Sequence, residues 1–159
     1  MTTEATTPVG QDLQAKGIAF EEFRHAGPVR SLEQAAEERN QRPEQVVRSI
    51  LFRLAQDEYL MVAVAGPNQI DWRALRQAAG QSRMTMAKPE EVLQVTGYQI
   101  GAVAPFGLPI PIRIMLDESI LQEEIVSMGS GVRGTAVILS TSELQRALGD
   151  VEVVNVLSH

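Results

Sequence analysis

An apolar stretch broken by glycine and proline, residues 97–111, constrains this chain more than any other segment. It holds three glycines and three prolines, and most of the residues between them are apolar. Glycine and proline prevent a regular helix and leave room only for short pieces of strand. Because a loop in solvent would be polar, this stretch is predicted to lie against the core. It is then either the wall of a ligand pocket, with main-chain N–H groups turned to the ligand, or a buried connection between two elements.

The composition is that of one globular domain spanning residues 1–159. Hydrophobic residues make up 44% of the 159 residues and charged residues 21%, which is ordinary for a protein with a sizeable single core. No apolar run approaches the roughly 18 to 20 residues that a membrane helix needs. The Thr-rich N-terminus lacks the basic and apolar regions of a signal peptide. We therefore expect a cytoplasmic protein with no membrane partner, whose residues 1–8 are flexible.

Few residues are suited to covalent or metal chemistry. The chain has no cysteine, and His25 and His159 are its only histidines, so we expect no metal site and no cofactor. A serine nucleophile is not indicated, because neither Ser127 nor Ser130 lies in a G-x-S-x-G segment. His25, in a turn after a predicted strand, is either a hydrogen-bonded structural group or a catalytic one.

The net charge of -6 is unevenly distributed. Residues 1–88 hold 11 basic and 11 acidic side chains, whereas residues 89–159 hold 3 basic and 9 acidic ones. An acidic protein is not expected to bind DNA. Twelve of the fourteen basic residues are arginine, whose planar side chain pairs well with phosphate and carboxylate. The arginines of the first half form either an anion-facing surface or an ordinary mixed-charge surface.

Hydrophobic periodicity and turn residues predict an α+β domain. The expected sheet is curved, mixed and mostly antiparallel, with about seven short strands and four to five helices that lack a strict βαβ alternation. Ser31 and Asp71 are expected to cap helices. The predicted strand segments are 18–24, 46–54, 58–65, 84–87, 112–116, 124–128, 135–139 and 151–156. The predicted helices are 10–16, 32–39, 71–79, 89–96 and a last one that ends at Leu148.

Residues 129–134 match the dinucleotide-binding pattern G-x-G-x-x-G. That motif requires the glycines to lead from a strand into a helix. Residues 135–139, Thr-Ala-Val-Ile-Leu, are strand-like instead. We therefore interpret the segment as a hairpin turn, and leave open whether Arg133 faces a ligand.

Arg48 interrupts an apolar face of a predicted strand. It shares this face with Val46, Ile50 and Phe52 in the alternating segment. A charge there is costly unless it reaches solvent, a carboxylate or a ligand. Arg48 is thus either a binding residue or an arginine that extends past the edge of the core or pairs with an acid.

Several segments together resemble the YbaK/prolyl-tRNA synthetase-associated domain family. The most specific are Thr-Gly-Tyr at residues 96–98 and the G-x-x-x-P segment from Gly101 to Pro105. The segments Pro-Glu-Gln-Val-Val-Arg-Ser-Ile at 43–50, Pro-Glu-Glu-Val at 89–92 and Gly-Val-Arg-Gly at 131–134 add to the likeness. The resemblance covers about residues 18–156.

This resemblance implies a mixed α/β fold and a function in aminoacyl-tRNA editing. Such proteins hydrolyse the ester that joins a wrong small amino acid, of the alanine or cysteine type, to tRNA. A synthetase pocket cannot strongly reject a smaller amino acid, so a second site removes the error. The implied partners are the acceptor end of aminoacyl-tRNA and a synthetase, and the oligomeric state stays open. The tRNA's terminal hydroxyl and a bound water would perform the chemistry, consistent with the absence of thiol, metal and triad.

The resemblance also assigns roles to individual residues, and the chain departs from the family pattern at one of them. Arg48 stands where the family typically has a lysine important for deacylation. If that lysine is an electrostatic anchor, arginine can replace it; if it carries a proton, arginine cannot. The resemblance implies a free-standing trans-editing deacylase, with a non-catalytic aminoacyl-tRNA or small-ligand binding module as the alternative. The implied catalytic residues are Arg48, Gly101 and Pro105. The implied substrate-binding residues are His25, Tyr98, Ala102, Val103, Ala104, Phe106, Gly131 and Arg133.

Overall fold

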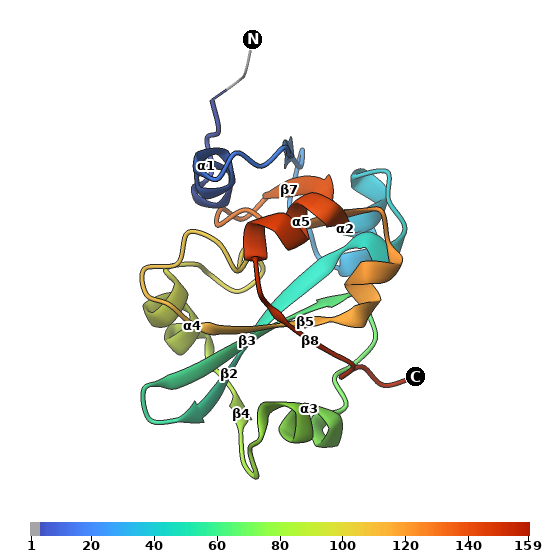
Figure 1. Ribbon diagram of the computed structural model, residues 1–159. Coiled ribbons are helices and arrows are strands. Elements are labelled where there is room, and N and C mark those ends of the chain that lie inside the picture. Colours follow the sequence, from blue (N-terminus) through green and yellow to red (C-terminus); the bar gives the residue numbers. More distant parts are fainter. Residues whose placement is uncertain (1–3) are drawn as a thin grey trace.

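The computed structural model describes residues 4–159, which form two β-sheets packed with helices (Figure 1). The larger sheet has the strand order β4-β2-β3-β5-β8 and the smaller one β1-β7-β6. The strands are β1 (Glu21–Arg24), β2 (Val47–Ala55), β3 (Glu58–Ala65), β4 (Thr85–Met86), β5 (Arg113–Asp117), β6 (Ile125–Gly129), β7 (Thr135–Ser140) and β8 (Glu152–Val154). The α-helices are α1 (Pro8–Ala15), α2 (Leu32–Glu38), α3 (Trp72–Ala79), α4 (Pro89–Thr96) and α5 (Thr141–Leu148), and 3₁₀ turns occupy η1 (Pro43–Gln45) and η2 (Glu118–Gln122).

The predicted α+β fold with mixed, mostly antiparallel strand pairing is confirmed, and only the numbers of strands and sheets differ. Strand β5 pairs in parallel with β3 and β8, whereas the other strand pairs are antiparallel. Residues 4–159 contain eight strands instead of about seven, and they form two sheets instead of one. The two sheets meet where β2 begins, because Val46 forms an isolated bridge with Ser127 of β6.

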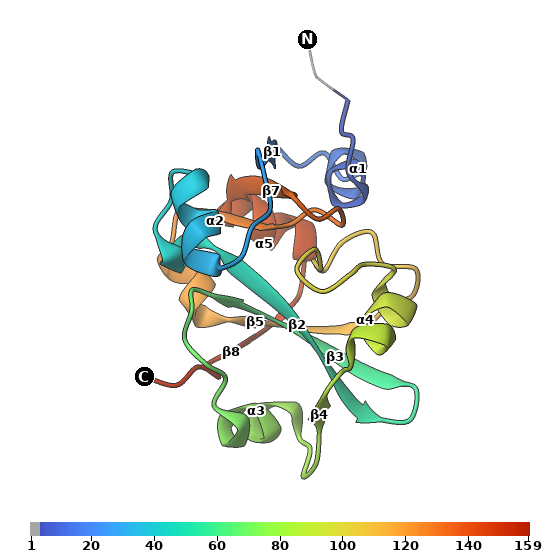
Figure 2. The same ribbon diagram turned by 180° about the vertical axis from the view of Figure 1, so that it is seen from behind.

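The hairpin of β2 and β3 divides the core into two layers. Leu60, Val62 and Val64 pack with α3 on one side, while Met61 and Ala63 face the other core cluster. Figures 1 and 2 show α3 on one side of the larger sheet and the smaller sheet, with α1 and α5, on the other. Strand β3 is apolar on both faces because both are covered.

Local signals determine where several helices begin and end. Ser31 accepts a hydrogen bond of 3.0 Å from the Gln34 amide, and Asp71 accepts one of 3.1 Å from the Ala74 amide. Both predicted caps are therefore confirmed. Gly97, at a φ of 79°, ends α4 in the left-handed conformation, which lets the chain turn sharply into the 97–111 loop.

The N-terminal segment is attached to β1 through Glu22. The amides of Thr6 and Thr7 donate to its carboxylate at 3.0 and 2.9 Å, and Thr7 in turn caps α1. The expected flexibility of residues 1–8 falls partly on residues 1–3, which lie outside the described part of the chain. From Thr6 onward the segment is hydrogen-bonded, and Pro8 already begins a helix.

Candidate functional site

A cavity of about 870 Å³ lies between β2, α2 and the loops that contain Gly101 and Arg133. Its lining is mostly apolar, with Val29, Leu32 and Val103 among the contributors. Three arginines also line it, Arg39, Arg48 and Arg133, but among residues 4–159 no aspartate or glutamate does. In a chain of net charge -6, this is a positively charged cavity.

The 97–111 loop supplies one wall of the cavity. Ile100, Gly101 and Val103 line it, whereas Ala102, Ala104, Pro105 and Phe106 are buried behind them. Within residues 4–159, the N–H groups of Gly101 and Val103 donate no hydrogen bond. Each of the two interpretations therefore applies to a part of the loop. Its first part is a pocket wall, and its centre is a buried connection.

Tyr98 holds this loop in a closed shape. Its side chain is buried, and its hydroxyl donates to the carbonyl oxygens of Phe106 at 2.7 Å and Gly107 at 3.0 Å. These bonds join the start of the loop to its middle, where one hydroxyl hydrogen is shared between two carbonyl groups. The predicted substrate-binding residue Tyr98 thus lies behind the wall and supports it.

The glycine-rich 129–134 turn packs backbone to backbone against the loop. The Gly131 amide donates to the Ala102 carbonyl at 2.9 Å. A Cβ on Gly129 would lie 2.6 Å from the carbonyl atoms of Ala102, and one on Gly131 would lie 2.7 Å from the Tyr98 ring. The turn joins β6 to β7 with no helix after it, so its interpretation as a hairpin turn is confirmed.

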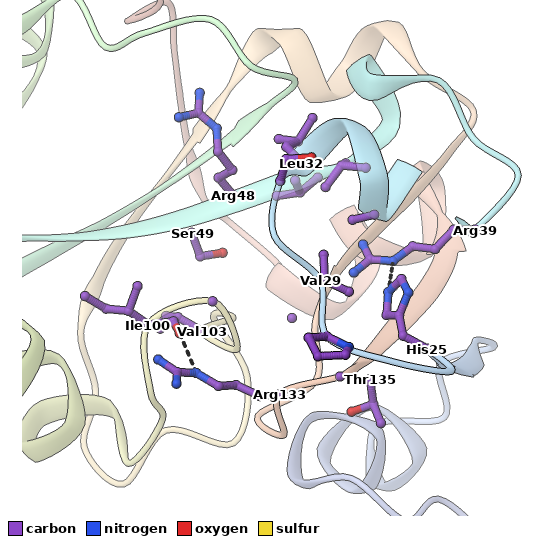
Figure 3. Close-up of a pocket in the computed structure, with 18 of the residues that line it drawn as sticks. His25, Val29, Leu32, Arg39, Arg48, Ser49, Ile100, Val103, Arg133 and Thr135 are labelled. Atoms are coloured by element: carbon purple, nitrogen blue, oxygen red, sulfur yellow. Dashed lines mark hydrogen bonds between the residues drawn. The ribbon is translucent and has the colours of Figure 1, made fainter. Parts of the chain in front are cut away.

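Arg48 and Ser49 leave β2 on opposite sides (Figure 3). The Arg48 Nε donates to the Gly66 carbonyl at 2.9 Å, and its Nη2 donates to the Asn68 carbonyl. Burial lowers the pKa of Arg48. The guanidinium of Arg48 therefore donates to backbone carbonyls of the loop that follows β3. The sequence did not predict these partners.

Ser49, which was not predicted as a site residue, points toward the cavity wall. Figure 3 shows its hydroxyl directed to the side where Ile100 and Val103 lie. The Oγ atom is buried and has no hydrogen-bond partner within residues 4–159. A buried hydroxyl without a partner is costly, so a ligand group would stabilise it. Because side chains alternate along a strand, the position of Arg48 on one face of β2 was the sequence signal that Ser49 lies on the other face.

A chain of hydrogen bonds fixes Arg39 beside the cavity. The His25 Nδ1 lies 2.7 Å from Glu38 Oε1, and the Arg39 Nε donates to His25 Nε2 at 3.1 Å. Because arginine only donates, Nε2 accepts, and His25 is neutral with its proton on Nδ1. The Arg39 Nη1 donates to the Ser127 Oγ at 2.9 Å. Both nitrogens of His25 are thus occupied, which supports its structural interpretation.

Arg133 lies at the edge of the cavity. It is exposed, and its Nε donates to the Ile100 carbonyl at 3.1 Å. This bond connects the glycine-rich turn to the 97–111 loop, as Figure 3 shows. The rest of the guanidinium of Arg133 stays available to a ligand.

Five of the predicted site residues come together around the cavity, and six do not. Those that line it are His25, Arg48, Gly101, Val103 and Arg133; those that lie behind are Tyr98, Ala102, Ala104, Pro105, Phe106 and Gly131. Arg39 and Ser49 line the cavity and were not predicted as site residues. Within residues 4–159, no group of three histidine or acidic side chains could hold a metal ion. No helix of this part is long and apolar enough to cross a membrane.

The chain belongs to the aminoacyl-tRNA editing domain family, whose model matches residues 26–147. The resemblance seen in the sequence is therefore confirmed. An uncharacterized protein of Bacillus subtilis, YwhH, is 35% identical over 114 residues, which cover 72% of each chain. The proline–tRNA ligase of Brachyspira hyodysenteriae is 36% identical over 74 residues, 46% of this chain but only 13% of the ligase.

Solved structures share the fold over nearly the whole chain. A crystal structure described as that of "a putative trans-editing enzyme for prolyl tRNA synthetase" superposes with a TM-score of 0.86 at 25% identity and covers 96% of both chains. The crystal structure of the hypothetical protein APE2540 has the same TM-score at 24% identity and covers 95% of this chain.

Proposed function

We propose that this protein is a trans-editing aminoacyl-tRNA deacylase that acts as a free-standing protein on a small misattached amino acid. One observation carries the proposal: the cavity of this editing domain has unpaired hydrogen-bond donors on its lining residues, while its histidine, His25, has both ring nitrogens occupied by residues of the described chain, 4–159. Gly101, Val103 and Ser49 line the cavity, and the two N–H groups and the buried serine hydroxyl have no hydrogen-bond partner within residues 4–159. Such a site can bind an ester and stabilise an oxyanion.

The reaction then relies on water and on the substrate instead of a protein side chain for its proton transfer. A water molecule attacks the ester carbonyl carbon, and the carbonyl oxygen gains negative charge next to the N–H groups of the 101–103 wall. The bond between this carbon and the ribose oxygen breaks, and the ribose oxygen leaves with a proton that originates from the water. The products are the free amino acid and tRNA. The neighbouring ribose hydroxyl of the tRNA orients the water, because His25 has no free nitrogen.

The lining favours a small, uncharged amino acid. Val29, Leu32, Ala35 and Val103 form apolar surface, which holds a short apolar side chain without leaving a polar group unpaired. A cavity of about 870 Å³ also leaves room for the terminal adenosine. We therefore propose alanine and cysteine as the misattached amino acids. Because a proline–tRNA ligase is among the relatives, we propose that they are carried by the tRNA that such ligases charge.

A deacylation assay over a panel of charged tRNAs tests the proposal. Proline-specific tRNA carrying alanine, cysteine or serine is incubated with the protein, and the same tRNA carrying proline is the control. We expect release of alanine or cysteine well above the uncatalysed rate, with proline spared. Hydrolysis of no member of the panel would refute the proposal.

A second candidate function, a non-catalytic module that binds aminoacyl-tRNA or a small ligand, is favoured by the position of Arg48. Its guanidinium is bound to the carbonyls of Gly66 and Asn68 and lies on the face of β2 opposite Ser49. A residue held there has to leave these carbonyls before it can reach an ester at the 101–103 wall. In this alternative the cavity binds substrate without hydrolysing it.

The variant Arg48→Lys separates the two functions. If the protein is a deacylase in which Arg48 is an electrostatic anchor, both the wild type and Arg48→Lys hydrolyse the substrate. Hydrolysis that appears only in Arg48→Lys would identify an editing fold that has lost its proton carrier. Binding of a non-hydrolysable aminoacyl-adenosine with no turnover in either protein would establish the binding module. The exposed Arg53 of the same strand provides the matched control, Arg53→Lys.

A further inference from the structure

Arg39 is a positively charged side chain whose protein partners are neutral. Its Nε donates to the neutral His25 and its Nη1 to the Ser127 hydroxyl. Within residues 4–159 it forms no ion pair with a carboxylate. The carboxylate of its neighbour Glu38 is turned away, to His25 and to the side-chain amide of Gln34 at 2.7 Å.

The charge of Arg39 is retained although the side chain is largely buried. Burial lowers the pKa of Arg39 to about 10, and the charge of Glu38 opposes this effect. The guanidinium therefore stays protonated near pH 7. A largely buried cation without a counter-ion costs free energy in the unliganded protein, and an anion in the cavity would remove that cost.

The hydrogen bonds of Arg39 orient it for an anion. His25 and Ser127 occupy Nε and one hydrogen of Nη1, so the remaining donors of the fork, including Nη2, are unused by residues 4–159. Figure 3 shows the guanidinium extended toward Val29, another residue of the cavity lining, with a dashed bond from the Arg39 side chain to His25. Such a fork suits two oxygens of one phosphate group.

Arg39 is not the only cation at the cavity. Arg133 lies at its edge, bonded to the 97–111 loop by Nε alone, and also forms no ion pair within residues 4–159. In the described part of the chain, no acidic side chain lines the cavity that both arginines border. The cavity thus offers paired positive charge to one ligand group, next to apolar surface for the rest of the ligand.

We propose that Arg39, held from behind by His25 and Ser127, binds the phosphate group of the ligand's terminal nucleotide, with Arg133 assisting at the edge of the cavity. This rests on the proposed function, in which that phosphate joins the last adenosine of tRNA to the nucleotide before it. Glu38 and His25 are then positioning residues for the arginine. For Arg39, this proposal selects the anion-facing surface from the two alternatives that the sequence left open for the arginines of the first half.

Two analogues of the tRNA end test the proposal. They are 3′-alanylamino-3′-deoxyadenosine, whose amide replaces the labile ester, and the same compound with a 5′-phosphate; titration calorimetry gives the affinity of each. We expect the wild-type protein to bind the phosphorylated analogue about ten- to a hundredfold more tightly, as expected for charged hydrogen bonds to phosphate. Arg39→Gln should abolish this preference and leave the affinity for the unphosphorylated analogue unchanged. Arg73→Gln, at an exposed position of α3, should behave like wild type.

Other outcomes separate this proposal from the proposed function. Equal loss of both affinities in Arg39→Gln, or no preference for the phosphorylated analogue in the wild type, would overturn it. Binding of inorganic phosphate that depends on Arg39, with neither analogue bound, would support the anion site and refute the proposed function. Binding of neither analogue nor phosphate would overturn the anion site. If Arg39→Gln does not fold in a thermal melt, Arg39→Lys replaces it, and is expected to retain only part of the preference because a lysine lacks the fork.

Discussion

A Cβ atom placed on Gly129 would lie 2.6 Å from the carbonyl carbon and oxygen of Ala102. The end of β6 and the 97–111 loop therefore touch through their backbones, at a separation that no side chain tolerates. This contact places the Gly101 and Val103 wall at its position beside the cavity.

Gly129→Ala is expected to destabilise the protein by about 1 to 3 kcal/mol, because one backbone must move to admit the methyl group. Chemical denaturation measures the change. Gly27→Ala is the control, since a Cβ there meets no atom within 4 Å, and it should be nearly neutral. Equal stability of the two variants would show that the loop accommodates the methyl group.

Tyr98→Phe is expected to cost about 1 to 3 kcal/mol, because it leaves the buried carbonyl of Phe106 without its donor and removes the bond to Gly107. The thermal midpoint should fall by several degrees. Tyr59, whose hydroxyl donates to Glu91 at 3.2 Å near the surface, provides the comparison: Tyr59→Phe should change the midpoint less. An unchanged midpoint in Tyr98→Phe would mean that the loop keeps its shape without the hydroxyl.

Ser49→Ala separates stability from function. Since the Ser49 Oγ has no partner within residues 4–159, its removal should leave stability unchanged or slightly higher. If the hydroxyl binds the ester or the attacking water, deacylation should fall about tenfold, the effect of one lost hydrogen bond. Ser82→Ala, at an exposed site between α3 and β4, is the control. Full activity of Ser49→Ala would exclude Ser49 from the reaction.

Glu22→Gln is expected to change how stability depends on pH. Burial raises the pKa of Glu22, but hydrogen bonds from Thr7 and Thr6 outweigh it and hold the pKa below its usual value. A folded pKa below the unfolded one contributes stability above the unfolded pKa, near 4.5, and this contribution disappears as pH falls through the folded pKa. Thermal melts from pH 7 to pH 3 should therefore show a smaller acid-induced loss in Glu22→Gln than in wild type. Glu21→Gln, exposed on the same strand, should follow the wild-type curve.

The pattern along β2 shows what could be predicted of the site and what could not. Arg48 and Ser49 lie on opposite faces of β2, as expected for neighbouring residues of a strand. Alternation did not say what either side chain would meet at the cavity, since this depends on where the 97–111 loop and the loop after β3 pack. The sequence therefore singled out Arg48, a charge on an apolar face, but not Ser49. The Ser49 hydroxyl is notable only because the fold buries it without a partner.

Local chemistry in the sequence determined the α+β class, the caps at Ser31 and Asp71, and the end of α4 at Gly97. Residue patterns also excluded a dinucleotide-binding fold and identified the editing family. These depend on contacts between residues near in sequence, or on residue patterns that the family shares. The tertiary structure alone decided the division into two sheets, the fit of Gly129 against Ala102, and the positions of Arg39 and Ser49. These depend on segments far apart in sequence: His25 and Ser127, which hold Arg39, are about a hundred residues apart, and only folding brings them to the same guanidinium.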